Sequence, residues 1–287
     1  METNSIKGSS IKKKRVFSKT ILYLVVIVLS VIFLSPFVWM LSTSLKTQEE
    51  IYSISKSILP EKIYWTNYKL AVTEMPFLRY FFNTAVITIL VVVGICFSSS
   101  LVAYAMSKIE WKGKKILFPV IIATMMIPSQ VTMIPLYIVY TKMHMVGTIL
   151  PLTLPYFLGG GAYYIFLLRQ FFHTIPNSLV ESARIDGASH FTIYSRIMLP
   201  LCKPALTSVG IFAFMFTWSD FMGPLLYLNK QEQYTLSIGL QAFMGTHFVE
   251  WGPLMAASTI FTVPVILIFF FAQKYFIEGI TVTGIKG

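Results

Sequence analysis

The chain has 287 residues, of which 55% are hydrophobic and only 12% carry a charged side chain. Soluble domains have about 25% charged residues, so this composition and a mean hydropathy of +0.70 exclude an ordinary cytosolic enzyme, a disordered chain and a secreted scaffold. Two cysteines are too few for a disulfide framework. We therefore expect an integral membrane protein.

Six segments are apolar enough to cross a bilayer as helices, each of about 20 residues or more. They are residues 21–41, 83–106, 116–140, 149–172, 205–228 and 253–276. The first follows a basic start at Lys12 to Arg15, as a secretory signal does, but its apolar run is longer than the roughly 7–15 residues of a signal core. A retained anchor is favoured, and the fold class is an all-α polytopic membrane protein with six transmembrane helices.

The distribution of Lys and Arg predicts the orientation. With the N-terminus inside, sixteen of the 23 basic residues lie in inner segments and seven in outer ones, which favours cytoplasmic termini. The net charge of +11 is thereby explained without a nucleic-acid partner. The expected order is a cytoplasmic basic N-terminus (1–20), a first transmembrane helix (21–41), an extracytoplasmic loop (42–82), a core transmembrane domain (83–276) and a cytoplasmic C-terminal tail (277–287).

Prolines and glycines interrupt several of these segments. Proline removes a helix hydrogen bond, and the freed carbonyl must find a partner in a neighbouring helix. For any single proline, kinking for packing is the favoured interpretation, whereas the number of breaks is typical of helices that surround a path or move. The residues concerned are Pro36, Pro128, Pro135, Pro155, Gly159–Gly161, Gly223, Pro224 and Pro264.

The loop at residues 173–204 lies on the cytoplasmic side in this topology and is patterned as two short helices. Ser178, with Glu181 three residues later, predicts a capping box at the start of the first helix. Gly187 can take the left-handed conformation that ends that helix. We therefore expect a helix–Gly turn–helix.

The second short helix is expected to start after Ser189, whose side chain can cap it. It should run to about Met198 and stop before Pro200, because the residue before a proline is disfavoured in a helix. The loop lacks the broad apolar face and Lys-rich face of a membrane-surface helix. Docking into another protein and an amphipathic surface helix both remain open on these grounds.

At this point the sequence resembles a known family. The loop is similar to the "EAA" loop of ABC-importer permeases, whose pattern is E-A-A, three residues, G, nine residues, I-x-L-P. Ser182 stands in place of the second Ala, a small-for-small change. The matching residues are Glu181, Ser182, Ala183, Gly187, Ile197, Leu199 and Pro200, and the extended pattern of the sugar-importer branch adds Ile185, Asp186, Ala188, Ser189 and Pro204.

The resemblance extends along nearly the whole chain, to the type of permease that pairs with a second, different permease in the maltose importer. Ser219 stands where this branch often has Asn, and Thr283 shifts the match at the C-terminal end. The further matching residues are Asn67, Tyr68, Asn83, Thr84, Ala103–Ala105, Gly113, Lys114, Leu168, Arg169, Phe171, Phe172, Trp218, Asp220, Phe221, Pro224, Leu225 and Gly284–Gly287.

The resemblance implies several partners. A second homologous permease completes the translocation path, ATP-binding ABC subunits bind below it, and an extracytoplasmic solute-binding protein delivers a sugar substrate to the loop at residues 229–252. The chain lies in the lipid bilayer of the bacterial plasma membrane. It has no G-x-x-x-x-G-K-[ST] loop, so it is expected to be non-catalytic and to bind no cofactor, with ATP and Mg used by the partner ATPase.

The resemblance also implies roles for single residues. The EAA helix would act as the coupling helix in an ATPase cleft, with Gly187 setting the turn. Glu181 and Asp186 would meet basic groups of the ATPase or hold the loop's own amides, with the capping box an equal alternative for Glu181. Arg184 and Arg196 are docking contacts or markers of the inner face. The tail from Gly284 is expected to touch the ATPase.

Asp220 is the one acid inside a predicted span, roughly 24 Å from the inner face if the helix is continuous from Pro204. An ionisable group at that depth is a functional candidate, and Trp218 nearby could stack on a sugar ring. Asp220 could instead hydrogen-bond a neighbouring helix or lie in the interface with Tyr227. Substrate contact by Trp218 and Asp220 is thus one of two interpretations.

Two other classes compete with this interpretation. An ion-coupled secondary transporter would show paired or inverted repeats and several intramembrane ionisable groups. A membrane hydrolase would show converging catalytic groups such as H-E-x-x-H. The sequence has neither, and its four histidines show no metal-ligand spacing.

Overall fold

The computed structural model describes residues 3–53, 57–245 and 248–284. These residues are almost entirely helical, and the described part of the chain contains no strand beyond an isolated antiparallel bridge between Met244 and Val249. The expected all-α class is confirmed.

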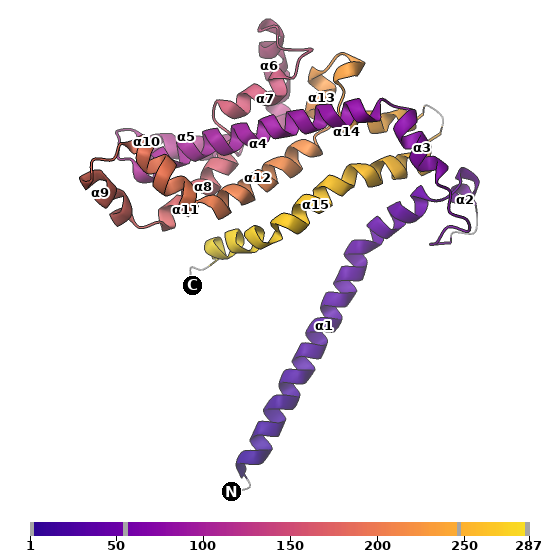
Figure 1. Ribbon diagram of the computed structural model, residues 1–287, viewed down its shortest axis with the longest axis horizontal. Helices are drawn as coiled ribbons and strands as arrows, with labels where there is room; N and C mark the ends of the chain where they lie inside the picture. Colours follow the sequence, from indigo (N-terminus) through magenta and orange to yellow (C-terminus); the bar gives the residue numbers. More distant parts are fainter. Residues whose placement is uncertain (1–2, 54–56, 246–247, 285–287) are drawn as a thin grey trace. The chain divides into compact units, whose positions relative to one another are not determined.

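Fifteen α-helices follow one another along the described residues (Figure 1). A π-helical turn at Tyr194–Met198 and two short 3-10 helices, Gln231–Gln233 and Leu240–Phe243, lie between them. The α-helices are α1 (Thr3–Ser44), α2 (Gln48–Tyr52), α3 (Thr66–Thr73), α4 (Phe77–Lys108), α5 (Lys114–Thr124), α6 (Ser129–Lys142), α7 (Leu150–Phe157), α8 (Ala162–Thr174), α9 (Asn177–Ile185), α10 (His190–Ile193), α11 (Leu199–Leu201), α12 (Lys203–Trp218), α13 (Met222–Tyr227), α14 (Leu236–Gly239) and α15 (Trp251–Gly284).

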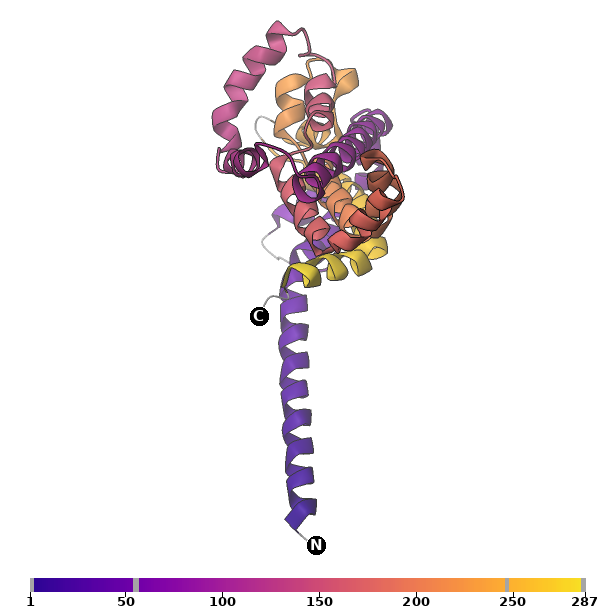
Figure 2. The same ribbon diagram turned by 90° about the vertical axis from the view of Figure 1, so that its left-hand side faces the viewer.

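Four helical stretches are long and apolar enough to cross a membrane, and two bent pairs bring the number to six if each pair is one span. The four are Phe17–Ser44, Phe77–Lys108, Leu150–Thr174 and Trp251–Gln273. In the first bent pair, α5 and α6 meet at 99° (Figure 2). Each of the six predicted segments overlaps one of these elements, so the count of six holds if each bent pair is one span. The predicted third span, residues 116–140, is wrong as a continuous helix, because α5 ends at Thr124 and α6 starts at Ser129 in a new direction.

The predicted fifth span, residues 205–228, is wrong as a continuous helix. Its helix α12 ends at Trp218, a break follows at residues 219–221, and α13 begins at Met222. The bend of 78° at this span lies earlier, between His190–Leu201 and Lys203–Trp218. Asp220 therefore lies in a helix break, where its backbone groups and its side chain can form the hydrogen bonds of a turn.

The chain divides into two compact units. The first contains residues up to Ala71 together with Phe243–Thr259. Within it, the Asn67 side-chain amide donates to the carbonyls of Ser44 (3.0 Å) and Lys46 (2.7 Å), and the Tyr68 hydroxyl lies 2.9 Å from Ser44 Oγ. These bonds satisfy carbonyls at the end of α1 that have no partner in the helix itself. The Asn-Tyr pair singled out in the sequence thus ties α3 to the end of α1.

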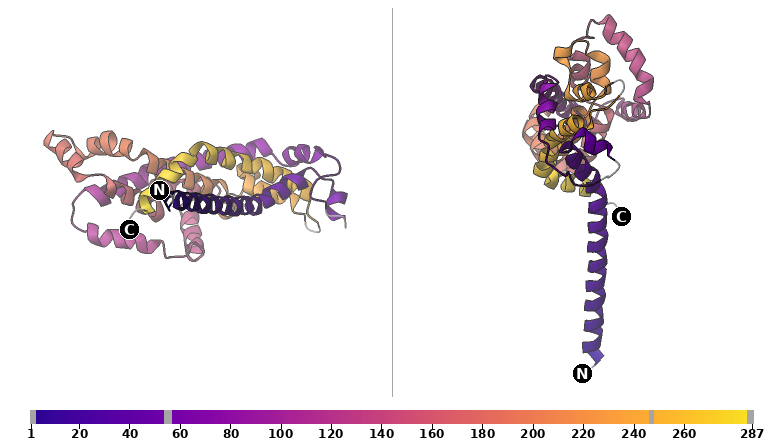
Figure 3. Two further views of the ribbon diagram at one scale, coloured as in Figure 1. Left: turned by 90° about the horizontal axis from the view of Figure 1, so that it is seen from below. Right: turned by 90° about the vertical axis from the view of Figure 1, so that its right-hand side faces the viewer.

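In the second unit, residues 72–242 and 260–287, α4 packs against α7, α8 and α12. Figure 1 and the view from below in Figure 3 show α4, α8 and α12 running side by side. The buried positions of α4 recur every three or four residues, which is the spacing of one helix face. They include Ile87, Val91, Ile95 and Ser98.

Close contact between α4 and the α7–α8 connection depends on small residues. Gly160 has a φ of +67°, and a Cβ there would lie 1.9 Å from Ser99 Oγ and 2.8 Å from Ser99 N. Ser98 Oγ donates to the carbonyl of Tyr156 at 2.6 Å. Gly160 therefore allows the α7–α8 connection to approach the backbone of α4 closely.

Replacing Gly160 by Ala should destabilise the folded chain. The added methyl group would clash with the backbone of α4 and occupy an unfavourable φ, at a cost of about 1–3 kcal/mol. Thermal unfolding of the purified protein in detergent should show a lowered transition temperature. Gly159→Ala is the matched control, because its Cβ would meet nothing within 4 Å. Equal unfolding temperatures for the two variants would contradict the packing argument.

Candidate functional site

Helix α9 starts at Asn177, directly after Pro176, and no side chain caps its first turn. The predicted capping box of Ser178 and Glu181 is therefore wrong: the helix begins at Asn177, so Ser178 is already inside the helix. The carboxylate of Glu181 lies exposed on the helix surface. Of its two proposed roles, capping is absent and docking stays a prediction.

The end of α9 is a left-handed turn at Gly187, with φ of +78°. Ala188 N donates to the carbonyl of Ala183 (2.9 Å), and Gly187 N donates to that of Arg184 (3.0 Å). These two bonds are those of a Schellman motif, which satisfies the last carbonyls of a helix. The predicted glycine turn is confirmed.

The second helix of the loop, α10, begins as predicted at Ser189, whose Oγ accepts from Thr192 N at 3.1 Å. Its predicted end before Pro200 is wrong. Leu199 N donates to the carbonyl of Tyr194, five residues back, so the helix widens into a π-turn and continues through Pro200 to Leu201. Pro200 is the second residue of α11 and directly follows the π-turn, where the hydrogen-bond pattern of a regular α-helix is already interrupted.

One side of the loop is held by the core. Val180, Ile193 and Met198 are buried, and the Tyr194 hydroxyl lies 2.7 Å from Ser100 Oγ of α4. The Tyr194 ring also packs on Tyr104 of α4, with 5.5 Å between the centroids. These contacts fix the loop at one end of the helices of the second unit (Figure 1).

The other side of the loop is open. Ile185 and Phe191, on either side of the glycine turn, are 87% and 70% exposed. Ser182, Arg184, Asp186, Gly187 and Arg196 are also exposed, while Ala183 is buried and Ala188, Ile197 and Leu199 are partly buried. Arg184 Nη2 lies 2.8 Å from His190 Nε2, which joins α9 to α10 across the turn. The sequence motif thus forms a preorganised, two-helix surface with apolar residues at its tip.

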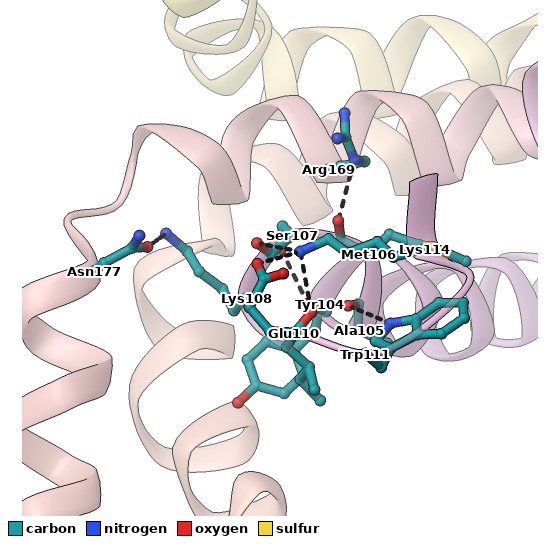
Figure 4. A network of polar contacts seen from close by, with 11 residues as sticks. Tyr104, Ala105, Met106, Ser107, Lys108, Glu110, Trp111, Lys114, Arg169 and Asn177 are labelled. Carbon is teal, nitrogen blue, oxygen red and sulfur yellow. Dashed lines mark hydrogen bonds and ion pairs between the residues drawn. The ribbon is translucent and has the colours of Figure 1, made fainter. Parts of the chain in front are cut away.

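The C-terminal end of α4 is held by donors from the segments that follow it and from α8 (Figure 4). The last carbonyls of a helix have no partner within it. Here Trp111 Nε1 donates to Ala105 O (3.2 Å), Arg169 Nε to Met106 O (3.3 Å) and Lys114 Nζ to Ser107 O (3.4 Å). Lys and Arg near a helix C-terminus also favour its dipole. Basic residues first interpreted as topology markers therefore close the end of this helix.

Lys114 also bonds the segment between α4 and α5, where its Nζ donates to the carbonyl of Ile109 at 3.0 Å. Its Nζ donates to Glu110 Oε1 at 2.9 Å. This hydrogen bond and the charge of Lys114 hold the pKa of Glu110 below its ordinary value. The pair keeps the short connection close to the end of α4.

A cavity of about 340 Å³ lies among α4, α6, α7, α12 and α13. Its polar lining includes Thr84, Tyr140, Tyr156, Thr217, Asp220 and Tyr227. Thr217 Oγ1 is buried without a hydrogen-bond partner among the described residues. The pocket therefore combines hydroxyl groups, aromatic rings and one carboxylate.

Asp220 lines this cavity and also shapes the helix break. Its Oδ1 accepts from Gly223 N (3.1 Å), and its carbonyl accepts from Ser237 Oγ (2.6 Å). Trp218, in contrast, is only 3% exposed and is stacked on Phe214 and Phe261, with Nε1 donating to Phe261 O. Stacking of a sugar on Trp218 would require a change in this packing, whereas Asp220 already faces the cavity.

The N-terminal part of α4 also has a bonded partner. Asn83 Nδ2 donates to the carbonyls of Glu232 (2.8 Å) and Tyr234 (3.0 Å), and Thr84 Oγ1 accepts from Leu236 N (2.9 Å). The Asn-Thr pair noted in the sequence thus anchors the segment before α14 to α4. The predicted contacts of the tail concern Gly284, the last residue of α15, and residues 285–287, which lie outside the described residues.

Residues 99–282 match the family described as "Binding-protein-dependent transport system inner membrane component". This match covers more than half of the chain, so the chain belongs to that family, the permease subunits of ABC importers. The rival interpretation, an ion-coupled secondary transporter, finds no support. Membrane-spanning helices and this family together define a multi-pass protein of the plasma membrane.

Individual relatives cover almost the whole chain. It is 34% identical over 262 residues to the arabinooligosaccharides transport system permease protein AraQ of Bacillus subtilis, covering 90% of this chain and 92% of AraQ. It is 34% identical to the probable starch degradation products transport system permease protein AmyC of Thermoanaerobacterium thermosulfurigenes, covering 91% and 94%. It is 31% identical to the trehalose/maltose transport system permease protein MalG of Thermococcus litoralis, covering 96% and 99%.

The fold is also similar to a chain in the crystal structure of a bacterial ABC transporter involved in import of the acidic polysaccharide alginate. The TM-score is 0.80, and the match covers 92% of this chain and 98% of that chain at 23% identity. At this identity the likeness shows the fold alone.

Removing the Ser189 cap should loosen α10. An N-cap serine contributes about 1 kcal/mol, so in Ser189→Ala the Thr192 amide should exchange its hydrogen about fivefold faster. Hydrogen exchange followed by mass spectrometry on the loop peptide measures this. Ser182→Ala, an exposed serine within α9, is the control and should leave the rate unchanged. Equal rates in both variants would mean that Ser189 does not hold the start of α10.

Proposed function

We propose that the chain forms half of the translocation path of an importer for sugars or oligosaccharides, together with a second homologous permease. The printed names of its relatives support the solute class: AraQ for arabinooligosaccharides, AmyC for starch degradation products and MalG for trehalose and maltose. The cavity lined by hydroxyl groups and tyrosines has the chemistry that binds polyhydroxylated solutes.

The exposed Gly187 turn is the observation that carries the coupling role. Helix α9 is anchored through Val180 and Ala183 and presents Ile185 at its tip, next to mixed charges. Apolar residues exposed on a rigid turn favour insertion into a cleft of another protein. We propose that this surface docks into an ATP-binding ABC subunit on the cytoplasmic side, which requires both termini of the chain to be cytoplasmic.

The energy for transport comes from that partner. The chain has no phosphate-binding loop of its own, so ATP and Mg are bound and used by the ABC subunit. Closure of the ATP-bound subunits would displace α9 and turn the path from inward-facing to outward-facing. In this scheme the chain is a non-catalytic subunit that binds no cofactor.

Gly187→Asp tests the docking role. A Cβ at Gly187 meets nothing within 4 Å in the chain itself, so the variant should insert and assemble at a cost of about 1–2 kcal/mol from the left-handed backbone. A charged side chain at the tip should nevertheless abolish solute uptake while ATP hydrolysis by the assembled complex continues. Ser178→Asp, at the other end of α9, adds the same charge as a control and should retain uptake. Normal uptake by Gly187→Asp would remove the docking role.

A solute-binding protein is expected to engage the outer loop at residues 229–252. Deleting residues 240–248 should abolish stimulation of ATP hydrolysis by that protein, measured with the importer in proteoliposomes, while unstimulated hydrolysis persists. Residues 246 and 247 of this deletion lie outside the described residues. Unchanged stimulation would refute the role of the loop.

Asp220 is proposed to contact the solute in the path, with Trp218 nearby. In Asp220→Asn the Gly223 amide keeps its acceptor, and only the carboxylate charge is lost. Losing a charge-assisted hydrogen bond to a sugar hydroxyl should weaken solute transport about tenfold or more. Ser219→Ala is the neighbouring control. The measurement is the uptake of labelled sugar by the two variants. Equal uptake would contradict solute contact and would mean that Asp220 only stabilises the helix break.

A further inference from the structure

Lys108, the last residue of α4, is bonded to both helices that meet at the entrance of the coupling loop. Its Nζ donates to the carbonyl of Ile175 (2.5 Å), the residue that ends α8, and to Asn177 Oδ1 (2.7 Å), on the first residue of α9. Figure 4 shows the Lys108 and Asn177 side chains directed toward each other across the gap between α4 and α9.

The bond to Asn177 joins the first residue inside α9 to α4. Pro176 occupies the N-cap position of α9, and a proline side chain cannot accept a hydrogen bond from a backbone amide of the first turn. Asn177 Oδ1 accepts from Lys108. An ammonium near a helix N-terminus is unfavourable for the helix dipole. The arrangement therefore serves to join two helices rather than to stabilise α9 alone.

The remaining anchors of α9 are less directional. Val180 and Ala183 bury small apolar side chains against the core. Packing of small apolar groups has no preferred direction, whereas a hydrogen bond from an ammonium group depends on distance and angle. Lys108 thus supplies a directional link between α9 and α4.

Helix α4 carries this link to the opposite end of the second unit. From Lys108 to Asn83 the helix runs 25 residues, about 38 Å at 1.5 Å per residue. At that end Asn83 and Thr84 are bonded to the segment at residues 232–236, and Thr84 also lines the cavity. A single helix therefore connects the coupling loop to the wall of the cavity and to the outer segment.

We propose that Lys108 is a positioning residue that fastens α9 to α4, so that a displacement of the coupling helix moves α4 and the outer segment with it. This inference rests on the proposed docking of α9 to the ATPase. Without the link, α9 would still bind the ATPase and ATP would still be hydrolysed. The displacement of α9 would then move α4 only in part. The number of solute molecules transported per ATP hydrolysed would fall.

The test uses the complete importer, with its partner permease, ATP-binding subunits and solute-binding protein, in proteoliposomes. Lys108→Met keeps the length of the side chain and removes the donor, and should lower the number of solute molecules moved per ATP about tenfold. Lys112→Met removes a charge from an exposed residue nearby and is the matched control, with an unchanged ratio. Asn177→Leu removes the acceptor of one Lys108 bond but leaves the bond to the Ile175 carbonyl, and should lower the ratio less. Asn177→Asp retains an acceptor and should keep the ratio unchanged.

A distance measurement separates this role from general damage. Spin labels are placed at two exposed positions, Ser182 in α9 and Phe97 in α4. The distance between the two labels should be the same in the resting and the ATP-trapped importer. In Lys108→Met the distance should change between these states. A wild-type transport ratio and an unchanged distance in Lys108→Met would overturn the proposal. If Lys108→Met does not assemble, the comparison of Asn177→Leu with Asn177→Asp is decisive. Equal numbers of solute molecules moved per ATP in these two variants would overturn the proposal.

The two proposals fail differently. A photoreactive residue at position 185 that does not crosslink to the ATPase in the otherwise unchanged importer would refute the docking of α9. Retained crosslinking with normal coupling in the Lys108 and Asn177 variants would refute the inference about Lys108 alone.

Discussion

The left-handed turn at Gly187 is the constraint on which the proposed coupling surface depends. Two hydrogen bonds, from Ala188 to Ala183 and from Gly187 to Arg184, close α9 and turn the chain into α10. A side chain with a Cβ would strain this backbone at φ of +78°. Because the turn is set by the backbone and α10 is packed on α4 through Tyr194, the exposed residues at the tip are held in place before any partner binds.

Local signals in the sequence predicted much of this fold. Apolar length located the spans, and the glycine turn and the Ser189 cap follow from preferences that act within four residues. The errors have local causes as well. Ser178 satisfies the capping-box pattern, which would start the helix at Leu179, yet the helix starts two residues earlier at Asn177. The prediction that the helix ends before Pro200 assumes a regular α-helix at residues 190–199. The π-turn at Tyr194–Met198 means that this helix is not regular. The break at Asp220 lies in an apolar stretch where hydropathy alone gives no sign of a turn.

Contacts between distant residues could not be predicted in this way. In the sequence, Lys108 and Arg169 contribute only to the count of basic residues in the inner segments, whereas in the structure they bond Ile175, Asn177 and the end of α4. Trp218 was expected near a sugar because it lies close to Asp220 in sequence. In the fold the two side chains diverge, one into an aromatic cluster and one toward a cavity. The family resemblance pointed to Asn83 and Thr84. It did not predict their bonding partners at residues 232–236.

The most direct test of the account is a crosslink from the tip of α9. A photoreactive amino acid placed at Ile185, which is 87% exposed, should crosslink to the ATP-binding subunit in membranes that contain the assembled importer. The same photoreactive amino acid placed at Leu78, an exposed position near the opposite end of α4, should not crosslink to that subunit. Absence of the crosslink at position 185 in an assembled importer, or labelling of that position by a reagent confined to the outside, would contradict the account.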